Sequence, residues 1–327
     1  MKQLFHPIAI GNLTIPGNLF LAPLAGFTDL AFRSVCAAYR ASLTYSEMVS
    51  AEGLARDNEK TGELLQRADN ERCFAVQLFM STPDQALRAL PRVVAVNPDI
   101  IDINCGCPVP KVVKTGAGSA LMKHPETIRA IVQAINSSTD IPVTVKIRLG
   151  WDSSSLNYLE AADAAVSGGA ALLTMHARTR AQGYAGTADI SHLALLKQAV
   201  NVPVIGSGDL FSAAAAREML VQTGIDGVMF ARGAIGNPFI FTATRHLLEH
   251  GVALPPPGAG ERIAQLLAHL DAVIAARGET VACREMRKHA GAYIKGLPGA
   301  SRIRREIVRA SSREEYRAIL DTYTHSS

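Results

Sequence analysis

The chain has 327 residues, 48% of them hydrophobic and 19% charged, with a formal net charge of +4. This composition predicts a globular protein with a large core. The absence of any apolar run of about 18 residues argues against a membrane span. The first residues lack a signal-peptide pattern, so we expect no export. An odd number of scattered cysteines argues against a disulfide framework and favours a reducing cytoplasm.

Short apolar segments rich in β-formers recur along the chain, and each is followed by a longer segment with helical spacing. The segments begin at Leu19, Leu43, Phe74, Ile100, Val143, Ala171, Pro203 and Gly227. Eight strands alternating with helices predict a (β/α)8 TIM barrel. A doubly wound sheet is the alternative, but the even repeats and the lack of a dinucleotide-binding fingerprint favour the barrel.

Two helix starts are marked by capping residues, Asp29 and Thr82, the latter directly before Pro83. The second repeat is irregular, because the segment between its strand and the next one, residues 50–72, is long and rich in charged side chains. We expect a loop and short helix there.

Three domains or segments are predicted. Residues 1–250 form the barrel, residues 251–260 a Pro- and Gly-rich linker, and residues 261–327 a domain of three or four helices. The last segment has 12 basic and 8 acidic residues, which accounts for the whole net charge. Within Arg284–Arg309 the excess is larger, 8 basic against 2 acidic residues. This charge predicts a polyanionic partner, although a solvated helical face is the simpler alternative.

Polar side chains follow nearly every predicted strand, at the end where barrel proteins carry their functional groups. Among these residues are Glu47, Gln77, Asn104, Cys105, Cys107, Lys146, Arg148, His176, Arg178, Ser207 and Asp209. Because an unpaired buried polar group costs about 1–3 kcal/mol, we expect a polar ligand at the centre.

The last two strands end in glycine-bearing turns, "GSGD" and "ARGAIGNP". These are the positions where such barrels commonly bind phosphate, and Arg232 would add a charged donor. Gln77, Asn104 and Lys146 suit a flat heteroaromatic ring. A phosphate with a ring over the barrel mouth describes FMN. Pyridoxal phosphate, with Lys146 as its Schiff-base lysine, is the alternative.

The stretch "DINCGCPVPK" places Cys105 and Cys107 two residues apart at the end of a strand. No second Cys or His pair has metal-ligand spacing, so we expect no metal site. One thiol can face the core while the other faces the mouth. Cys107 begins a long loop, expected to be flexible, that reaches the next helix at Pro125. With a reference pKa of about 8.5, its thiol could donate a proton near neutral pH.

These segments together resemble the tRNA-dihydrouridine synthases, flavin enzymes that reduce uridines in the tRNA D-loop. The resemblance lies in "LAPLAGFTDLAFR", "SEM", "DINCGCPVPKV" with "GAGSAL", "VKIRLGW", "MHARTR" and "REMRKHAGAYIKGLPGASRIRREI". It covers nearly the whole chain and is strongest to the bacterial B-type branch.

The resemblance implies specific roles. The ring and ribityl chain of FMN would contact Pro23, Leu24, Ala25, Gln77, Lys146 and His176, and its phosphate end Ser207, Gly208, Asp209, Ala231 and Arg232. Cys107 would be the proton donor, Asn104 and Arg178 would place the uridine, and Arg287, Lys288, Arg304 and Arg305 would bind tRNA. Ser207 and Ala231 depart from the family pattern, which has Asn and Gly there.

The implied reaction adds a hydride to C6 of uracil from reduced FMN and a proton to C5 from Cys107, with NADPH reloading the flavin. The target base must leave its stack, which loop nucleotides do readily. We expect a monomer. A small-molecule flavin reductase of the dihydroorotate or ene-reductase kind is a second hypothesis, which the basic tail disfavours. A non-catalytic RNA-binding barrel is a third, which the intact Cys107, Lys146, His176 and Arg232 disfavour.

Overall fold

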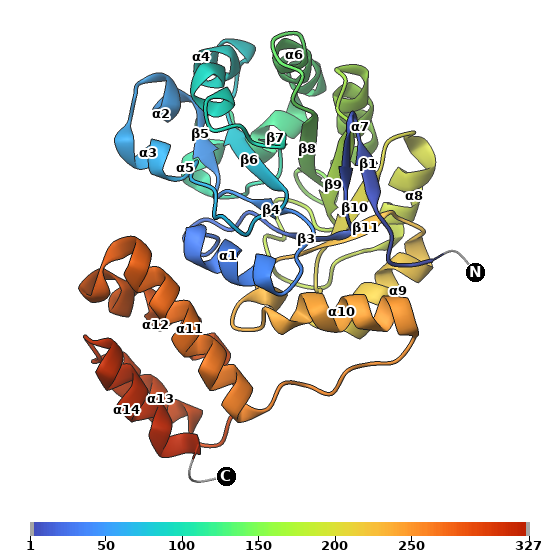
Figure 1. The fold of residues 1–327 in the computed structure, drawn as a ribbon. Coiled ribbons are helices and arrows are strands. Elements are labelled where there is room, and N and C mark those ends of the chain that lie inside the picture. Colours follow the sequence, from blue (N-terminus) through green and yellow to red (C-terminus); the bar gives the residue numbers. More distant parts are fainter. Residues whose placement is uncertain (1–2, 325–327) are drawn as a thin grey trace.

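The structure of the protein is a computed structural model that describes residues 3–324. A barrel of parallel strands is surrounded by helices, and a smaller helical domain lies beside it (Figure 1). In chain order the barrel strands are β3 (Leu19–Leu21), β4 (Thr44–Tyr45) with its continuation β5 (Val49–Ser50), β6 (Phe74–Phe79), β7 (Ile100–Asn104), β8 (Val143–Arg148), β9 (Leu172–His176), β10 (Val204–Ser207) and β11 (Gly227–Phe230).

The predicted (β/α)8 barrel is confirmed. Each segment predicted to be a strand contains one, and neighbouring strands pair in parallel. The first strand β3 pairs with the last strand β11, and a bridge between Phe20 and Leu43 joins β3 to the chain that enters β4. This closure distinguishes the barrel from a doubly wound sheet, in which the outer strands stay unpaired on one edge. Strands such as β7 and β9 are buried along their whole length, as expected when helices cover a parallel sheet.

The helices that surround the barrel begin at residues with recognisable capping chemistry. The Asp29 side chain accepts the Phe32 N–H at the start of α1, and Thr82 caps α4 directly before Pro83, as predicted. Residues 50–72 form only two short helices, also as expected. The outer helices are α1 (Leu30–Ala38), α2 (Ala51–Ala55), α3 (Glu59–Glu63), α4 (Pro83–Val94), α5 (Pro110–Val113), η1 (Gly118–Lys123), α6 (Pro125–Asn136), α7 (Tyr158–Ser167), α8 (Ser191–Ala199), α9 (Ala213–Thr223), η2 (Arg232–Ala234) and α10 (Phe239–His250).

An antiparallel hairpin of β1 (Ile8–Ile10) and β2 (Leu13–Ile15) precedes the barrel and was not predicted. Its Ile10 and Ile15 side chains are fully buried against barrel residues such as Phe20. The hairpin is short, and its three-residue strands give too little alternation to be recognised from sequence. Its packing closes the part of the core that faces away from the carboxyl ends of the strands.

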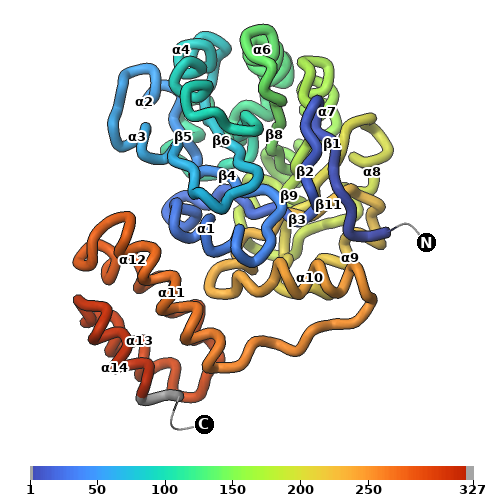
Figure 2. Tube along the Cα trace, viewed as in Figure 1, coloured from blue at the N-terminus to red at the C-terminus, as the bar shows by residue number. Residues whose placement is uncertain are grey.

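The chain after α10 runs through an extended Pro-rich segment into the helical domain, which lies beside α1 (Figure 2). Within residues 3–324 this domain consists of α11 (Ala259–Arg277), α12 (Glu279–Tyr293), α13 (Ala300–Ile307) and α14 (Arg313–Thr324). The helix α11 thus starts inside the segment 251–260 that was predicted to be a linker. The predicted domain limits at residues 1–2 and 325–327 lie outside the described residues. The domain has its own apolar core, into which Ala31 of α1 also packs.

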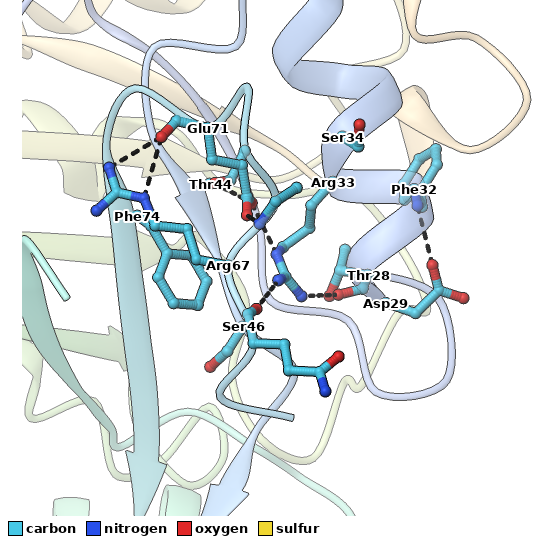
Figure 3. Close-up of polar contacts among 12 residues, drawn as sticks. Thr28, Asp29, Phe32, Arg33, Ser34, Thr44, Ser46, Arg67, Glu71 and Phe74 are labelled. Atoms are coloured by element: carbon cyan, nitrogen blue, oxygen red, sulfur yellow. Dashed lines mark hydrogen bonds and ion pairs between the residues drawn. The ribbon is translucent and has the colours of Figure 1, made fainter. Parts of the chain in front are cut away.

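A buried ion pair stabilises the loop region at the start of α1 (Figure 3). The Arg33 Nε donates to Glu71 Oε1 at 2.8 Å, and its other nitrogens donate to the carbonyls of Thr28 and Gln66. Glu71 also accepts the Thr44 hydroxyl at 2.6 Å. Every strong hydrogen-bonding group of the pair therefore has a partner, which offsets the cost of removing both charges from water.

We predict that Arg33→Met lowers the free energy of unfolding by about 3–5 kcal/mol, because it leaves the Glu71 carboxylate buried without its cation. Denaturation in guanidinium chloride, followed by circular dichroism, measures the loss. Arg92→Met is the matched control, since Arg92 forms an ion pair with Asp57 in which both side chains are largely exposed. Equal stability of the two variants would contradict the prediction.

Candidate active site

A cavity of about 480 Å³ opens at the carboxyl ends of the barrel strands. It is lined by nearly all the barrel residues predicted to form the site: Pro23, Leu24, Ala25, Asn104, Cys107, Lys146, His176, Ser207, Gly208, Asp209, Ala231 and Arg232. Gln77 and Arg178 are not among the lining residues. Strands far apart in the sequence thus bring these side chains to one place because their carboxyl ends meet at one face of the barrel.

Gln77 lies behind the cavity wall and connects β6 to β7. It is fully buried, its Nε2 donates to Asp102 Oδ2 at 2.7 Å, and its Oε1 accepts from Asn104 Nδ2 at 2.8 Å. The Asn104 Oδ1 in turn accepts the N–H groups of Gly106 at 3.1 Å and Cys107 at 2.9 Å. This chain of hydrogen bonds fixes the main chain that carries Cys107. Sequence reasoning missed Asp102, which ends the chain.

The Asp102 carboxylate is fully buried and accepts from Gln77 and from the Thr144 hydroxyl at 2.5 Å. Burial raises its pKa to about 6, although both hydrogen bonds oppose that shift. Within the hydrogen-bonded chain, Asp102 orients the Gln77 amide so that its carbonyl faces Asn104.

The two cysteines lie in different surroundings, as expected. Cys105 is fully buried in the main hydrophobic core. Cys107 lines the cavity and packs beside Val112 and Ala117. Burial raises the pKa of Cys107, although the Val109 N–H and the cations Arg148 and Lys146 oppose the shift. The Cys107 thiol is therefore protonated near neutral pH, which is the form a proton donor needs.

The loop after Cys107 was expected to be long and flexible, and the structure packs its second half against Cys107. The loop contains α5 and η1, and Ala117, Gly118 and Ser119 are buried. The Cys107 carbonyl accepts the Ser119 N–H at 3.0 Å. Gly118 has a φ of +62°, and a Cβ there would lie 2.8 Å from the same carbonyl oxygen. Glycine and the small residues beside it thus let the loop fold back onto the cysteine.

Several cations surround the cavity. Burial lowers the pKa of Lys146 to about 8, with nearby Arg148 adding to the shift. Burial and the neighbouring cations lower the pKa of His176 to about 2, so its imidazole is neutral at any working pH. Lys146 lines the cavity, and within residues 3–324 its ammonium donates to no main-chain or side-chain acceptor. A ligand with an anionic or carbonyl oxygen would supply one.

Arg148 also lines the cavity, although it was not among the predicted binding residues. Its side chain is 3% exposed, its Nε donates to the Gly106 carbonyl at 2.7 Å, and its Nη1 donates to the Thr179 carbonyl at 3.0 Å. The guanidinium thus links the segment before Cys107 to the loop after β9. Its position in "VKIRLG", two residues after Lys146, was the sequence signal.

The turn after β10 places a carboxylate between two arginines. Asp209 accepts the Ala188 N–H at 2.8 Å, two hydrogen bonds from Arg178 Nη2 at 2.7 and 2.9 Å, and one from Arg232 Nη2 at 3.3 Å. These donors lower its pKa even though burial opposes the shift. Asp209 therefore orients Arg232, and both side chains line the cavity.

Arg178 lies behind this turn with 1% of its side chain exposed. Besides its pair with Asp209, it donates to the carbonyls of Ala185 at 3.1 Å and Gly186 at 2.7 Å. Arg178 thus supports the loop after β9 and does not itself line the cavity.

Sequence reasoning also missed the aromatic rim. Tyr184 and Phe211 line the cavity yet are 51% and 53% exposed. The Arg232 guanidinium lies between them, 4.6 Å from the Tyr184 ring centroid and 5.3 Å from that of Phe211. Such cation–π contacts hold the arginine in place. An aromatic residue in each of two consecutive strand–helix loops was the only available signal.

The basic residues of the helical domain begin close to the cavity. Lys288 of α12 donates to the Gly26 carbonyl and lies 5.4 Å from the ring centroid of Phe27, a lining residue. Arg305 is exposed on α13, whereas Arg304 donates to the Gly291 carbonyl at 3.3 Å. Arg287 is partly buried. The positive surface thus extends from the cavity mouth along α12 and α13.

Among residues 3–324 there is no group of three or more His, Cys, Asp or Glu side chains placed to hold a metal ion. The same part of the chain has no helix with the length and apolarity that crossing a bilayer requires.

Fold and site together define a (β/α)8 barrel protein with a cationic cavity and a cysteine at the strand ends. Solved structures share this fold at low sequence identity. Histamine dehydrogenase from Rhizobium sp. 4-9 matches with a TM-score of 0.61 and 12% identity, over 83% of this chain and 51% of its own. Morphinone reductase matches with a TM-score of 0.56 and 14% identity, over 79% of this chain and 92% of its own.

Sequence comparison identifies the family. Residues 20–326 match the family described as Dihydrouridine synthase (Dus). The chain is 44% identical to "Probable tRNA-dihydrouridine synthase" of Treponema pallidum (strain Nichols), over 97% of this chain and 96% of that protein. It is 38% identical to "tRNA-dihydrouridine synthase B" of Pseudomonas aeruginosa, over 92% and 91%. The chain belongs to the dihydrouridine synthase family, which confirms the resemblance seen in its motifs, including that to the B-type branch.

We predict that iodoacetamide alkylates Cys107 slowly at pH 7 and about tenfold faster for each unit of pH up to about 9, because burial keeps the thiol protonated. Lys146→Met should slow alkylation at pH 8 at least about twofold, since it removes a cation that favours the thiolate. Mass spectrometry of the Cys107 peptide measures both rates.

Lys111→Met is the matched control, because Lys111 is an exposed lysine on the same loop. A Lys146→Met variant that reacts as fast as this control would contradict the assignment of Lys146 as a neighbour that favours the thiolate.

Proposed function

We propose that the protein reduces the C5–C6 double bond of a uridine in the D-loop of tRNA to 5,6-dihydrouridine, with FMN as cofactor and NADPH as reductant. The observation that carries the proposal is the place of Cys107 in a cavity also lined by Lys146 and Arg232, beside a basic helical domain, in a chain of the dihydrouridine synthase family. The relatives' descriptions support tRNA as the substrate.

The residues present fit FMN. Lys146 offers an ammonium without an acceptor in the described chain, which suits a ring carbonyl or ring nitrogen. Pro23, Leu24 and Ala25 offer a largely apolar wall for a flat ring system. Arg232, oriented by Asp209, suits the phosphate end, close to the turn at Ser207 and Gly208. Pyridoxal phosphate could use the same groups, but family membership favours the flavin.

Bound FMN would supply a hydride to C6 of the uracil. The chain's own residues would do the remaining work. Cys107 would donate the proton to C5, and its raised pKa keeps that proton in place until the reaction needs it. Asn104 fixes the Cys107 main chain and is itself held by Gln77. Arg148 holds the preceding glycine, so the thiol has a defined position.

The exposed rim and the basic helices would bind the RNA. A uridine must leave its stack to enter a cavity of this size, and loop nucleotides do so at low cost. Arginines of α12 and α13, among them Arg304 and Arg305, would contact phosphates, which makes binding sensitive to salt. The cytoplasmic location, the monomeric state and the choice of NADPH over NADH stay predictions.

The first test is a reaction of purified protein with FMN, NADPH and tRNA that lacks dihydrouridine. Mass spectrometry of the digested tRNA should find one D-loop uridine heavier by two hydrogen atoms. Unchanged tRNA from a yellow, NADPH-oxidising protein would favour a small-molecule flavin reductase. A colourless protein that does not take up FMN would favour a non-catalytic RNA-binding barrel.

We predict that Cys107→Ala lowers the rate of uridine reduction by about 10²–10⁴-fold while FMN and tRNA still bind, because the general acid is lost. Cys105→Ala is the matched control, since that thiol is buried in the core and does not line the cavity. Its activity per folded molecule should stay close to that of the unaltered protein. Equal activity of the two variants would remove Cys107 as the proton donor.

We predict that the double variant Arg304→Glu/Arg305→Glu weakens tRNA binding at least about tenfold and reduces its dependence on salt, because phosphate contacts are lost. Oxidation of NADPH without tRNA should be unchanged. The control is Arg129→Glu/Arg217→Glu, which reverses two exposed charges on the barrel helices α6 and α9. If both double variants bind tRNA equally, the basic helices are not the RNA-binding surface.

A further inference from the structure

The loop between β3 and α1, residues 23–28, forms one wall of the cavity and contacts the helical domain. It is a tight turn in which the N–H groups of Phe27 and Thr28 both donate to the Leu24 carbonyl, at 2.9 and 3.0 Å. Gly26, at its tip, is exposed and has a φ of +76°. Its neighbours Ala25 and Phe27 line the cavity.

The tip of this loop is held from two sides. The Gly26 N–H donates to Glu47 Oε2 at 2.5 Å, and Glu47 belongs to the barrel segment between β4 and β5. The Gly26 carbonyl accepts from the Lys288 ammonium of α12. One residue of the cavity loop therefore joins the barrel to the helical domain. The second contact is a charge-assisted hydrogen bond, which is stronger than a neutral one.

The Phe27 ring is also enclosed by α12. The Lys288 ammonium lies 5.4 Å from its centroid, and the His289 ring meets it edge-on at 5.6 Å. His289 further contacts Phe32 of α1, with ring centroids 5.0 Å apart. Helix α12 thus packs against the tip of the β3–α1 loop and against the first turn of α1.

The same helix approaches a second wall of the cavity. Gly236, after η2, has a φ of +68°, and a Cβ there would lie 2.5 Å from the main-chain atoms of Ala292 and Tyr293. Glycine is required at this position because the backbone of α12 passes so close. The preceding residue Ile235 lines the cavity. Helix α12 therefore braces the loops after the first and the last strand of the barrel, which are neighbours in space.

We propose that Lys288 is a positioning residue for the cofactor side of the site: its ammonium fixes the Gly26 carbonyl and thereby holds the loop that forms the wall against the flavin ring. The inference rests on the proposed function, because it assigns that wall to FMN. It differs from the role that the sequence predicted for Lys288, a contact to a tRNA phosphate. The two roles make opposite predictions for measurements made without RNA.

The test compares Lys288→Ala, Lys288→Arg and the unaltered protein, all without tRNA. Lys288→Ala should weaken FMN binding about three- to tenfold, measured by quenching of flavin fluorescence. In the FMN-free protein, hydrogen–deuterium exchange of the peptide spanning residues 23–28 should become faster. Lys288→Arg should restore both, because arginine can donate to the same carbonyl.

The matched control is Arg284→Ala, which removes a charge from the same helix. The Arg284 Nε donates to Thr280 of its own helix and does not contact the cavity loop. This variant should keep the FMN affinity and the exchange rate of the unaltered protein.

The outcomes separate the two proposals. If the unaltered protein binds no FMN, the proposed function fails. If it binds FMN and Lys288→Ala changes neither affinity nor exchange, the positioning role is overturned. A loss of tRNA affinity alone in that variant would then identify Lys288 as a phosphate contact.

Discussion

The hydrogen-bonded chain from Asp102 through Gln77 and Asn104 to the Cys107 main chain is the constraint on which the site depends. Each member is buried, and each amide uses its donor on one neighbour and its acceptor on the next. An amide in such a chain cannot rotate without leaving a polar atom unpaired in the core. The pairing of β6 with β7 places Gln77 beside Asp102, and the hydrogen bonds that follow hold the Cys107 main chain in one position.

The electrostatics of the cavity follow from the same burial. Low solvent access raises the pKa of Cys107 and lowers those of Lys146 and His176. A neutral thiol, a neutral imidazole and a lysine that is mostly charged at neutral pH then lie within one cavity. This combination suits a site that holds an electron-rich ligand and keeps a proton available. Arg232 adds a second cation, and Asp209 fixes its direction.

The helical domain and the barrel meet at the cavity rather than at a distant surface. Ala31 of α1 packs into the core of the helical domain, and Gly236 lets the α12 backbone approach the loop after β11. Helix α12 contacts two walls of the cavity, through Gly26 and Gly236. The RNA-binding surface that we propose and the cavity therefore share one helix.

The sequence by itself determined the barrel, the end that carries the site, and the family. The regular alternation of strands and helices determines the barrel. Because the strands are parallel, their carboxyl ends meet at one face of the barrel whatever side chains they carry. Local motifs carry the family. The tertiary structure alone decided which polar residues face the cavity. Gln77 and Arg178 stand behind its wall, whereas Arg148 and Tyr184 line it. Side-chain direction depends on strand register and on contacts such as that of Lys288 with Gly26, between residues distant in sequence, which no local pattern encodes.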